Sequence, residues 1–483
     1  MRRIAQPILF AALLVAMGAS RARGQNDQQQ NGQQQTEQPQ ATQPDQPVGG
    51  QQQNGEADNG DANVIPAVVQ PDLQASNGAG AFRPTFELPP DHSYVLPRFD
   101  LMSSVNTNGM YSSTPGQNQV ATLEYLLGGV TIEKVGRANE LSVNYLGGRS
   151  FSADGNIYNA TTNLFGLNDK WLHGRWAGNI SDQLSYASDT YFGGGVGSPG
   201  LAIPGSNIQP GFNPSQALIV GRIPILDNNA IAEIDYQTSP RSTLTFICGY
   251  TLLHYYGSGL INNDSILGEA GYNYQLSPRN SFAVEYLFDA IRFGGNTETI
   301  NENVLEATYV YQVAQRLSFR IGAGPDVSLI QGKSIPSDTY VSWRLASNLS
   351  YQLRQTTSVG FAYSHMLTGG SGVFLGAETD SLTGSVAQQL GRFWSVSANV
   401  GYSRNAALSV SGSLAPVGTY NAVYGGGGIS RQLGRDWKVY VNYQGTYQTS
   451  SAGICTTPPC GTNFSNQQVI AGFGWHPHAF AFD

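Results

Sequence analysis

A short segment recurs six times along the second half of the chain. The copies are YQTSPRSTLTF, YQLSPRNSFAV, YQVAQRLSFRI, YQLRQTTSVGF, QQLGRFWSVS and RQLGRDWKVY. Their shared glutamine falls at intervals of 38, 37, 40, 37 and 43 residues, at Gln237, Gln275, Gln312, Gln352, Gln389 and Gln432. One interval holds two strands of about ten to thirteen residues, a tight turn and a longer loop, which is the hairpin unit of an up-and-down transmembrane barrel.

Apolar and polar residues alternate within each repeat, which is the two-residue period of a strand with two different faces. In the segment 282–289, aromatic and aliphatic residues share one face, whereas Ala283, Glu285 and Asp289 share the other. The apolar face is the continuous one and carries many aromatic residues, as expected of a wall in lipid. A β-propeller has repeats of similar length but needs four short strands in each, and these repeats hold two long ones.

The alternation predicts 18 antiparallel strands. They lie at about 98–108, 120–133, 140–149, 158–167, 175–188, 229–238, 243–254, 265–276, 282–293, 303–313, 317–326, 339–353, 357–367, 379–390, 393–404, 419–433, 437–448 and 464–475. An even number places both termini on the periplasmic side, as in single-chain bacterial barrels. The first five strands have the weakest pattern, so the expected fold is an all-β transmembrane antiparallel up-and-down β-barrel of 16 to 18 strands.

The residues before the barrel differ sharply in composition. Residues 1–24 hold Arg2, Arg3 and an apolar run at 4–17, which predicts a signal peptide, because a membrane anchor needs about 20 apolar residues. Residues 25–63 are rich in Gln and Asn and are expected to be disordered. Residues 64–97 are a Pro-rich connector, and 98–483 form the barrel. The protein is therefore expected to be exported to the bacterial outer membrane.

Charge and cysteine content exclude several classes. Only 12% of residues are charged and the net charge is −8, which gives no electrostatic surface for nucleic acid. Cys455 and Cys460 flank TTPP in an exported chain and suggest a small loop disulfide. A metal site there would need more Cys or His nearby, and the sequence has none. Cys248 is alone in its strand.

The chain has no recognisable catalytic motif. GxSxG, HExxH and phosphate-binding loops are missing, and there are six histidines. His254 and His365 are expected at strand ends near the external rim. Ser364 directly precedes His365, so the two side chains are expected to point to opposite faces, which argues against a Ser–His pair. We therefore expect no enzyme activity, no cofactor and no catalytic or metal-binding residue.

Charged residues on the less apolar face are candidates for lining a lumen, because charges on the lipid face are costly. They are Glu233, Asp235, Glu269, Glu285, Asp289, Glu306, Arg320, Arg344 and Lys438. They either brace the wall by pairing or form a charged constriction, in which the excess of acids would favour cations. A barrel this wide leaves an aqueous channel unless plugged, so passive passage of small polar solutes or ions is the leading function. The alternative is an adhesin or binding protein that acts through external loops, including CTTPPC and 192–224.

Several architectural segments resemble known proteins. LPRFD near Leu96, GGR at 147–149, RWAGNISDQLSY and an aromatic C-terminal strand resemble porin-like outer-membrane β-barrel proteins, mostly uncharacterised, of acidobacteria-like genomes. The resemblance covers about 94–483 and implies location and shape, but no catalytic residue. The last strand stops at Trp475 and HPHAFAFD follows, which departs from the usual barrel ending. Expected partners are outer-membrane lipids, small polar solutes or ions and the barrel-assembly machinery, with a homotrimer left open and no nucleic acid.

Overall fold

The computed structural model describes residues 93–108, 120–152, 160–187, 223–257, 259–295, 298–314, 316–332, 337–354, 356–408, 418–451, 463–475 and 477–482. Its strands are β1 (Ser93–Asn106), β2 (Ala121–Val135), β3 (Asn139–Ser152), β4 (Ala160–His173), β5 (Trp176–Ala187), β6 (Ile225–Ser239), β7 (Ser242–Tyr255), β8 (Asn263–Ser277), β9 (Asn280–Phe293), β10 (Glu298–Ala314), β11 (Leu317–Gly332), β12 (Asp338–Arg354), β13 (Thr357–Thr368), β14 (Ala377–Leu390), β15 (Trp394–Ala407), β16 (Thr419–Leu433), β17 (Trp437–Ser450), β18 (Phe464–Trp475) and β19 (Phe480–Phe482). One 3-10 turn, η2, spans Gly370–Gly372. No helix in these ranges is long and apolar enough to cross a membrane.

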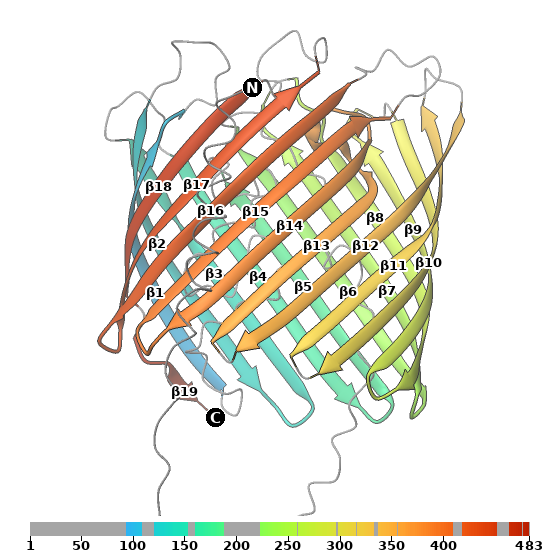
Figure 1. Cartoon of the computed structure of the whole chain (residues 1–483), viewed down its shortest axis with the longest axis horizontal. Coiled ribbons are helices and arrows are strands. Elements are labelled where there is room, and N and C mark those ends of the chain that lie inside the picture. The colour runs from blue at the N-terminus through green and yellow to red at the C-terminus, as the bar shows by residue number, and fades with distance from the viewer. Residues whose placement is uncertain are drawn as a thin grey trace, which may run out of the picture. The chain divides into compact units, whose positions relative to one another are not determined.

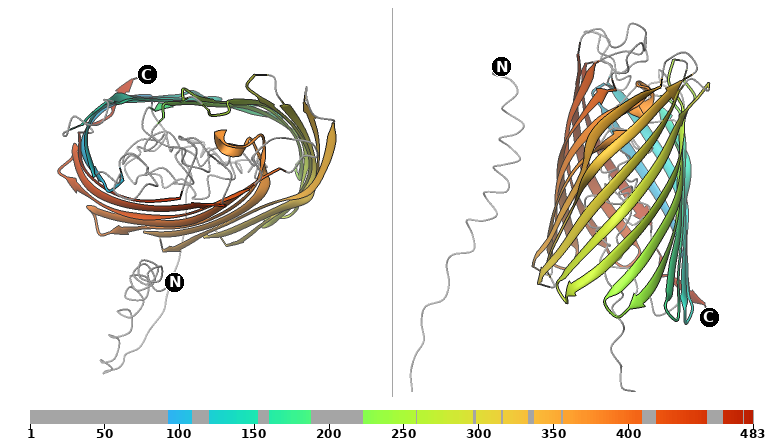
Figure 2. Two further views of the ribbon diagram at one scale, coloured as in Figure 1. Left: turned by 90° about the horizontal axis from the view of Figure 1, so that it is seen from above. Right: turned by 90° about the vertical axis from the view of Figure 1, so that its right-hand side faces the viewer.

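The strands form a closed antiparallel barrel (Figure 1). From β1 to β18 each strand pairs with the next, and β1 also pairs with β18, which closes a ring of eighteen. Viewed from the end, the ring is oval (Figure 2). All eighteen expected strands are present, so the expected fold class and the higher of the two expected counts are confirmed.

The C-terminal tail completes the closure of the ring. β18 covers β1 from Phe99 to Asn106, and the short strand β19 pairs with β1 again at Ser93–Val95. Pro97 lies between these two ladders and is paired only with Val130 of β2. A proline has no backbone N–H to donate, so this interruption of the ladder is where it is tolerated. β19 is too short to produce a detectable alternation in the sequence.

The repeated glutamine has a structural explanation at the rim of short turns. In all six copies its backbone N–H donates to a carbonyl oxygen of the preceding short turn, as from Gln275 to Arg241 at 2.7 Å and from Gln432 to Phe393 at 2.9 Å. On β6, β8, β10 and β12 the strand register also shifts directly after this glutamine. The recurring segment therefore marks the place where each of these strands enters a bulged or tight turn.

The barrel exposes apolar residues and buries polar ones. On β9, Val284 and Tyr286 are 42% and 47% exposed, whereas Ala283 and Glu285 are 2% and 5% exposed. The same inversion runs along the other long strands, with exposed Phe, Tyr, Val and Leu on the outer face. This is the pattern of a transmembrane barrel, because lipid replaces water at the outer wall.

Several expectations concern residues that the structure does not describe. They are the signal peptide at 1–24, the Gln-rich segment at 25–63, the connector up to residue 92, the insertion up to residue 222, and Cys455 with Cys460. β1 begins at Ser93, five residues before the expected start of the first strand. Cys248 is described, and it is a free cysteine on the exposed outer face.

Candidate functional site

The nine predicted lumen charges all lie on the inner wall, by which we mean the strand face opposite the exposed apolar side chains. Six of them are buried: Glu233, Asp235, Glu269, Glu285, Glu306 and Arg344. Asp289, Arg320 and Lys438 are half-buried on the same face. Eight of the nine come from β6 to β12 and six of those eight are acids, so this side of the inner wall carries an acidic arc.

Arg344 on β12 lies at the centre of this arc. Its Nη1 lies 3.3 Å from Oε1 of Glu302, and its Nε lies 3.7 Å from Oε2 of Glu306, both on β10. All three side chains are at most 5% exposed. Gly322 on β11 provides the space, because a Cβ at that position would collide with the Glu306 carboxylate. The arginine therefore balances carboxylates that would otherwise repel one another at close range.

Two further acids join this group and were missing from the sequence-based set. Glu302 lies directly opposite Asp289 in the β9–β10 ladder, and Asp326 of β11 lies opposite Val304 of β10. Both missed acids are at most 1% exposed. We call Asp289, Glu302, Glu306, Asp326 and Arg344 the acidic cluster. It carries more negative than positive groups.

A second charged pair lies on the other side of the ring. Arg98 and Asp100 of β1 are joined at 2.6 Å between Nη2 and Oδ2, and both are buried. Lys438 of β17 shares a lateral row with Asp100, because both pair with Gly474 of β18. β1 and β10 are nine positions apart in a ring of eighteen, so this pair lies on the wall opposite the acidic cluster.

The segment between β13 and β14 folds into the barrel. We call residues 369–376, which include η2, the inward loop; its orange ribbon lies inside the ring in the end view (Figure 2). Phe374 packs with Ile225 and Tyr255 on one side, and its ring lies 5.6 Å from that of Tyr420. Tyr255 is on β7 and Tyr420 is on β16, which are again nine positions apart. The inward loop therefore bridges opposite walls.

Three glycines allow the inward loop to adopt this path. Gly370, Gly372 and Gly376 have φ values of +77°, +76° and +88°. Residues with a Cβ rarely adopt this left-handed backbone conformation. Gly376 also lies against Ile300 of β10, where a Cβ would come within 2.5 Å of its Cδ1. Ile300 precedes Glu302 by two residues on the same strand face, so the inward loop lies directly beside the acidic cluster.

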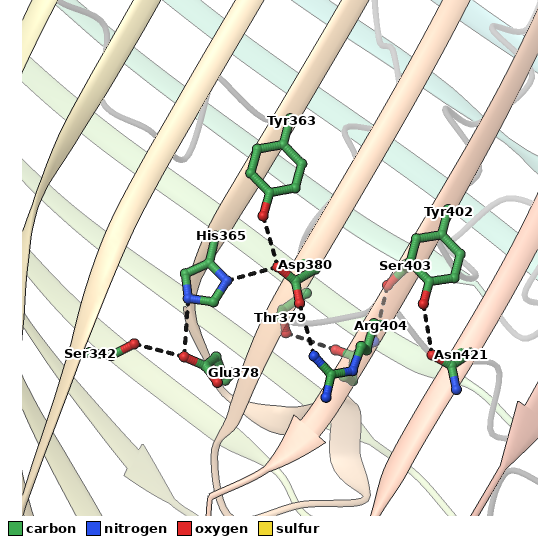
Figure 3. A network of polar contacts seen from close by, with 11 residues as sticks. Ser342, Tyr363, His365, Glu378, Thr379, Asp380, Tyr402, Ser403, Arg404 and Asn421 are labelled. Atoms are coloured by element: carbon green, nitrogen blue, oxygen red, sulfur yellow. Dashed lines mark hydrogen bonds and ion pairs between the residues drawn. The ribbon is translucent and has the colours of Figure 1, made fainter.

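A polar network secures the base of the inward loop on the outer face (Figure 3). Nδ1 of His365 on β13 lies 2.8 Å from Oδ1 of Asp380, and its Nε2 lies 3.0 Å from Oε1 of Glu378, both on β14. The His365 ring also stacks on Trp343 of β12 with ring centroids 4.0 Å apart. Ser342 of β12 donates to the same Glu378 oxygen at 2.7 Å.

This network replaces a missing part of the backbone ladder. β12 and β13 pair from Leu345 and His365 down to the short turn, but no ladder pair joins them above that point in the described residues. His365, Glu378 and Ser342 link the two strands there by side chains. On the inner side, the hydroxyl groups of Thr368 and Thr379 form a hydrogen bond of 2.9 Å. The base of the inward loop is thus held on both sides of the wall.

Replacing His365 with leucine is expected to lower the free energy of unfolding by about 1 to 3 kcal/mol, because the hydrogen bond to Asp380 and the contact with Glu378 are lost at the last ladder pair between β12 and β13. The matched control is Tyr402→Phe, which removes a single hydrogen bond of 2.9 Å to Asn421 on an exposed surface and should cost about 1 kcal/mol or less. Urea unfolding of both variants in detergent provides the comparison. Equal losses would show that the histidine does no more than an ordinary surface contact.

The two histidines expected near the external rim, His254 and His365, each hydrogen-bond to a neighbouring side chain. His365 hydrogen-bonds to Asp380 on the outer face, whereas Ser364 occupies an inner-face position of β13, so the two side chains diverge as expected. Within the described ranges, no group of three or more His, Cys, Asp or Glu side chains is arranged to hold a metal ion. His254 bonds to the amide of Asn262 at 2.9 Å and stacks edge-on with Tyr256.

No family model matches the chain, and no curated protein matches it in sequence. Solved structures that are similar to it include OccK2 (OpdF) of Pseudomonas aeruginosa, at 8% identity, with 79% of this chain and 98% of that one covered and a TM-score of 0.42. OpdK of the same bacterium, solved with vanillate, is similar at 10% identity, with 79% and 99% covered and a TM-score of 0.42.

The ferric-catecholate import receptor Fiu of E. coli K12 is similar at 9% identity, with 80% of this chain and 82% of that one covered and a TM-score of 0.38. These neighbours are bacterial outer-membrane barrels. Because the TM-scores are below 0.5, we assign no function to the chain from them. None of the three comes from the acidobacteria-like group, so that resemblance stays a prediction.

Proposed function

We propose that the protein is an outer-membrane channel for small polar solutes or ions, with a preference for cations. The observation that carries this proposal is the charged inner wall of a closed ring of eighteen strands. A ring of this size is too wide for side chains from the wall alone to fill. Charged side chains in a dry interior would be costly, so water is expected around them.

The distribution of charge supports the cation preference. Among the inner-wall charges named above, acids outnumber bases, and they are concentrated on β6 to β12. Arg344 of β12 braces two of the acids, whereas Glu233 and Asp235 lie on β6, six strands away along the ring. Ion pairs that brace the wall and acids that attract cations are therefore both present. The acids beyond the acidic cluster supply the excess negative potential.

The direct test is single-channel recording of the purified protein in a planar bilayer. We expect discrete current steps, and a reversal potential in a salt gradient that shifts toward the cation equilibrium potential. Absence of steps from correctly folded protein would contradict a channel. A reversal potential of zero would contradict the cation preference alone.

A pair of matched substitutions tests whether the inner wall is the source of the cation preference. Glu269→Gln removes a buried inner-wall acid, and we expect it to reduce the cation preference. Glu124→Gln removes an acid from the outer face, where it accepts a hydrogen bond from Ser103 at 2.8 Å, and should leave the preference unchanged. Equal effects of the two substitutions would place the selective field elsewhere.

The cellular setting belongs to the same proposal. We propose export by the signal peptide at 1–24, insertion among outer-membrane lipids by the barrel-assembly machinery, and a disulfide between Cys455 and Cys460 in an external loop. The exposed apolar outer face supports contact with lipid, and it would serve equally for contact between barrels in a homotrimer. Fractionation of the bacterial envelope and mass spectrometry of the mature N-terminus test export and cleavage together.

A further inference from the structure

Two arginines at the rim of short turns each lie over an exposed aromatic ring. The Cζ of Arg392, in the turn between β14 and β15, lies 5.6 Å from the centre of the Phe393 ring. The Cζ of Arg431 on β16 lies 5.2 Å from the centre of the Trp394 ring. The two aromatic residues are 49% and 40% exposed. We call these four residues the rim site. A ring that stacks on a guanidinium occupies one face of it and leaves the N–H donors at its edge free to bind an acceptor.

The backbone brings the two arginines to the same stretch of the rim. Trp394 and Arg431 are direct partners in the ladder between β15 and β16, which lie side by side in Figure 1, so their side chains share the outer face. The backbone N–H of Gln432 donates to the carbonyl oxygen of Phe393 at 2.9 Å, so the turn that carries Arg392 lies against β16. Two guanidinium groups are therefore held on neighbouring strands of the wall that contacts lipid.

No carboxylate balances this charge among the described residues around the rim site. The segments 388–396 and 428–435 contain no Asp or Glu, and the second segment adds Arg435, which is also exposed. The acid of the next turn, Asp436, bonds through Oδ1 to Nδ1 of His478 at 2.9 Å. Positive charges held close together without a counter-charge repel one another, and an anion bound between them removes this repulsion. The rim site therefore favours an anionic ligand.

The surface beside the rim site is apolar. Leu390 and Leu433 are exposed on the same outer face, and so is Trp437, whose ring stacks on Phe473 with centroids 4.5 Å apart. Exposed aromatic residues at the rim of a transmembrane barrel mark the level of the lipid head groups. A guanidinium matches the geometry of phosphate oxygens, to which it can donate two parallel hydrogen bonds. Donors for a phosphate thus lie next to a surface for acyl chains, which is the chemistry of a phospholipid.

We propose that the rim site binds the phosphate of an anionic phospholipid in the periplasmic leaflet. Arg392 and Arg431 donate to the phosphate oxygens, and the acyl chains lie along Leu390 and Leu433. The bound lipid fixes the depth of β14 to β17 in that leaflet. This binding does not depend on whether the barrel conducts, so the proposal and the channel function are tested separately.

Native mass spectrometry of the purified protein, titrated with phosphatidylglycerol or with phosphatidylethanolamine, tests the proposal. We expect the anionic lipid to bind about tenfold more tightly than the zwitterionic one, because two basic residues at a membrane surface attract it. The double variant Arg392→Gln with Arg431→Gln is expected to lose this preference. Equal binding of the two lipids to the unmodified protein would overturn the proposal.

The matched control is Arg241→Gln with Arg279→Gln. These two arginines are exposed in short turns of the same rim, and each follows Ser-Pro and precedes no aromatic residue. The control removes the same charge from the rim, and we expect it to keep the preference for the anionic lipid. An equal loss in both double variants would overturn the rim site, because the net charge of the whole rim would then determine binding.

Competition with inorganic phosphate distinguishes a lipid from a free anion. We expect phosphatidylglycerol to stay bound to the unmodified protein when an excess of inorganic phosphate is added at constant ionic strength, because the acyl chains contribute to binding. Displacement of the lipid would overturn a phospholipid as the occupant and would leave a site for phosphate alone.

Discussion

Replacement of Arg344 with methionine is expected to increase the cation preference of the channel. Arg344 is the one basic residue within the acidic cluster, and its loss leaves Glu302 and Glu306 without their partner. A unit charge about 7 Å from a permeating ion contributes about 0.6 kcal/mol in water, which corresponds to about threefold in relative permeability. Reversal potentials in a salt gradient give this ratio directly.

The same substitution is expected to destabilise the barrel by about 3 to 5 kcal/mol, because a buried ion pair that loses one partner leaves uncompensated charge. The matched control is Arg404→Met on the outer face. Arg404 is 49% exposed and lies 3.5 Å from Asp380, so its loss should cost about 1 kcal/mol or less and leave selectivity unchanged. Equilibrium unfolding in urea measures the change in stability, and reversal potentials on the same preparations measure the change in cation preference.

A rescue variant makes the prediction stricter. Adding Glu302→Gln and Glu306→Gln to Arg344→Met removes the uncompensated charge, so most of the lost stability should return while the cation preference falls. If the triple variant is no more stable than the single one, the arginine acts through packing of its side chain and the charge balance of the cluster is not its main contribution.

The wall of the barrel was predictable from sequence because it obeys a local rule. Each strand alternates between lipid and interior, and the rim is marked by the repeated glutamine whose N–H bonds to the preceding turn. The alternation and the repeated glutamine are both patterns among residues that are close in sequence. For this reason the eighteen strands were found, and the face of each charged residue followed from its parity along the strand.

The missed acids show where that rule ends. The expected strand at 303–313 began too late to include Glu302, although β10 starts at Glu298. The expected strand at 317–326 ended at Asp326, and β11 continues to Gly332. Strand ends carry weaker alternation because they rise above the lipid, where the outer face no longer needs to be apolar. The acidic cluster lies near those ends, so its full membership required the structure.

The inward loop was beyond local rules altogether. Its packing joins Tyr255 of β7 with Tyr420 of β16, residues far apart in the chain. No periodicity relates them. The sequence did contain one signal, the glycine-rich run GGSGVFLG at 369–376, in which three glycines have positive φ. Such a run fits an exposed turn as well as a tightly packed loop, so only the contacts distinguish the two.

Substitution of Gly372 with alanine is expected to displace the inward loop and to raise single-channel conductance. The residue has a φ of +76°, and a Cβ there would lie 2.5 Å from Cε2 and 2.8 Å from Cζ of Tyr255. The Tyr255 ring is buried between β6 and Phe374, so it has little room to yield. The inward loop must move away from β7 to relieve the collision. This movement widens the space between β7 and β16 that the loop otherwise bridges.

Gly391→Ala is the matched control, because it separates backbone strain from the contact with Tyr255. Gly391 has a φ of +69° in the short turn between β14 and β15, and a Cβ there meets nothing within 4 Å. Both substitutions incur the left-handed penalty of about 1 to 2 kcal/mol, and Gly372→Ala should lose more stability because the collision with Tyr255 adds to that penalty. Only Gly372→Ala should change conductance. If both variants conduct like the unmodified protein, the inward loop does not limit current, and the narrowest part of the path lies elsewhere along the inner wall.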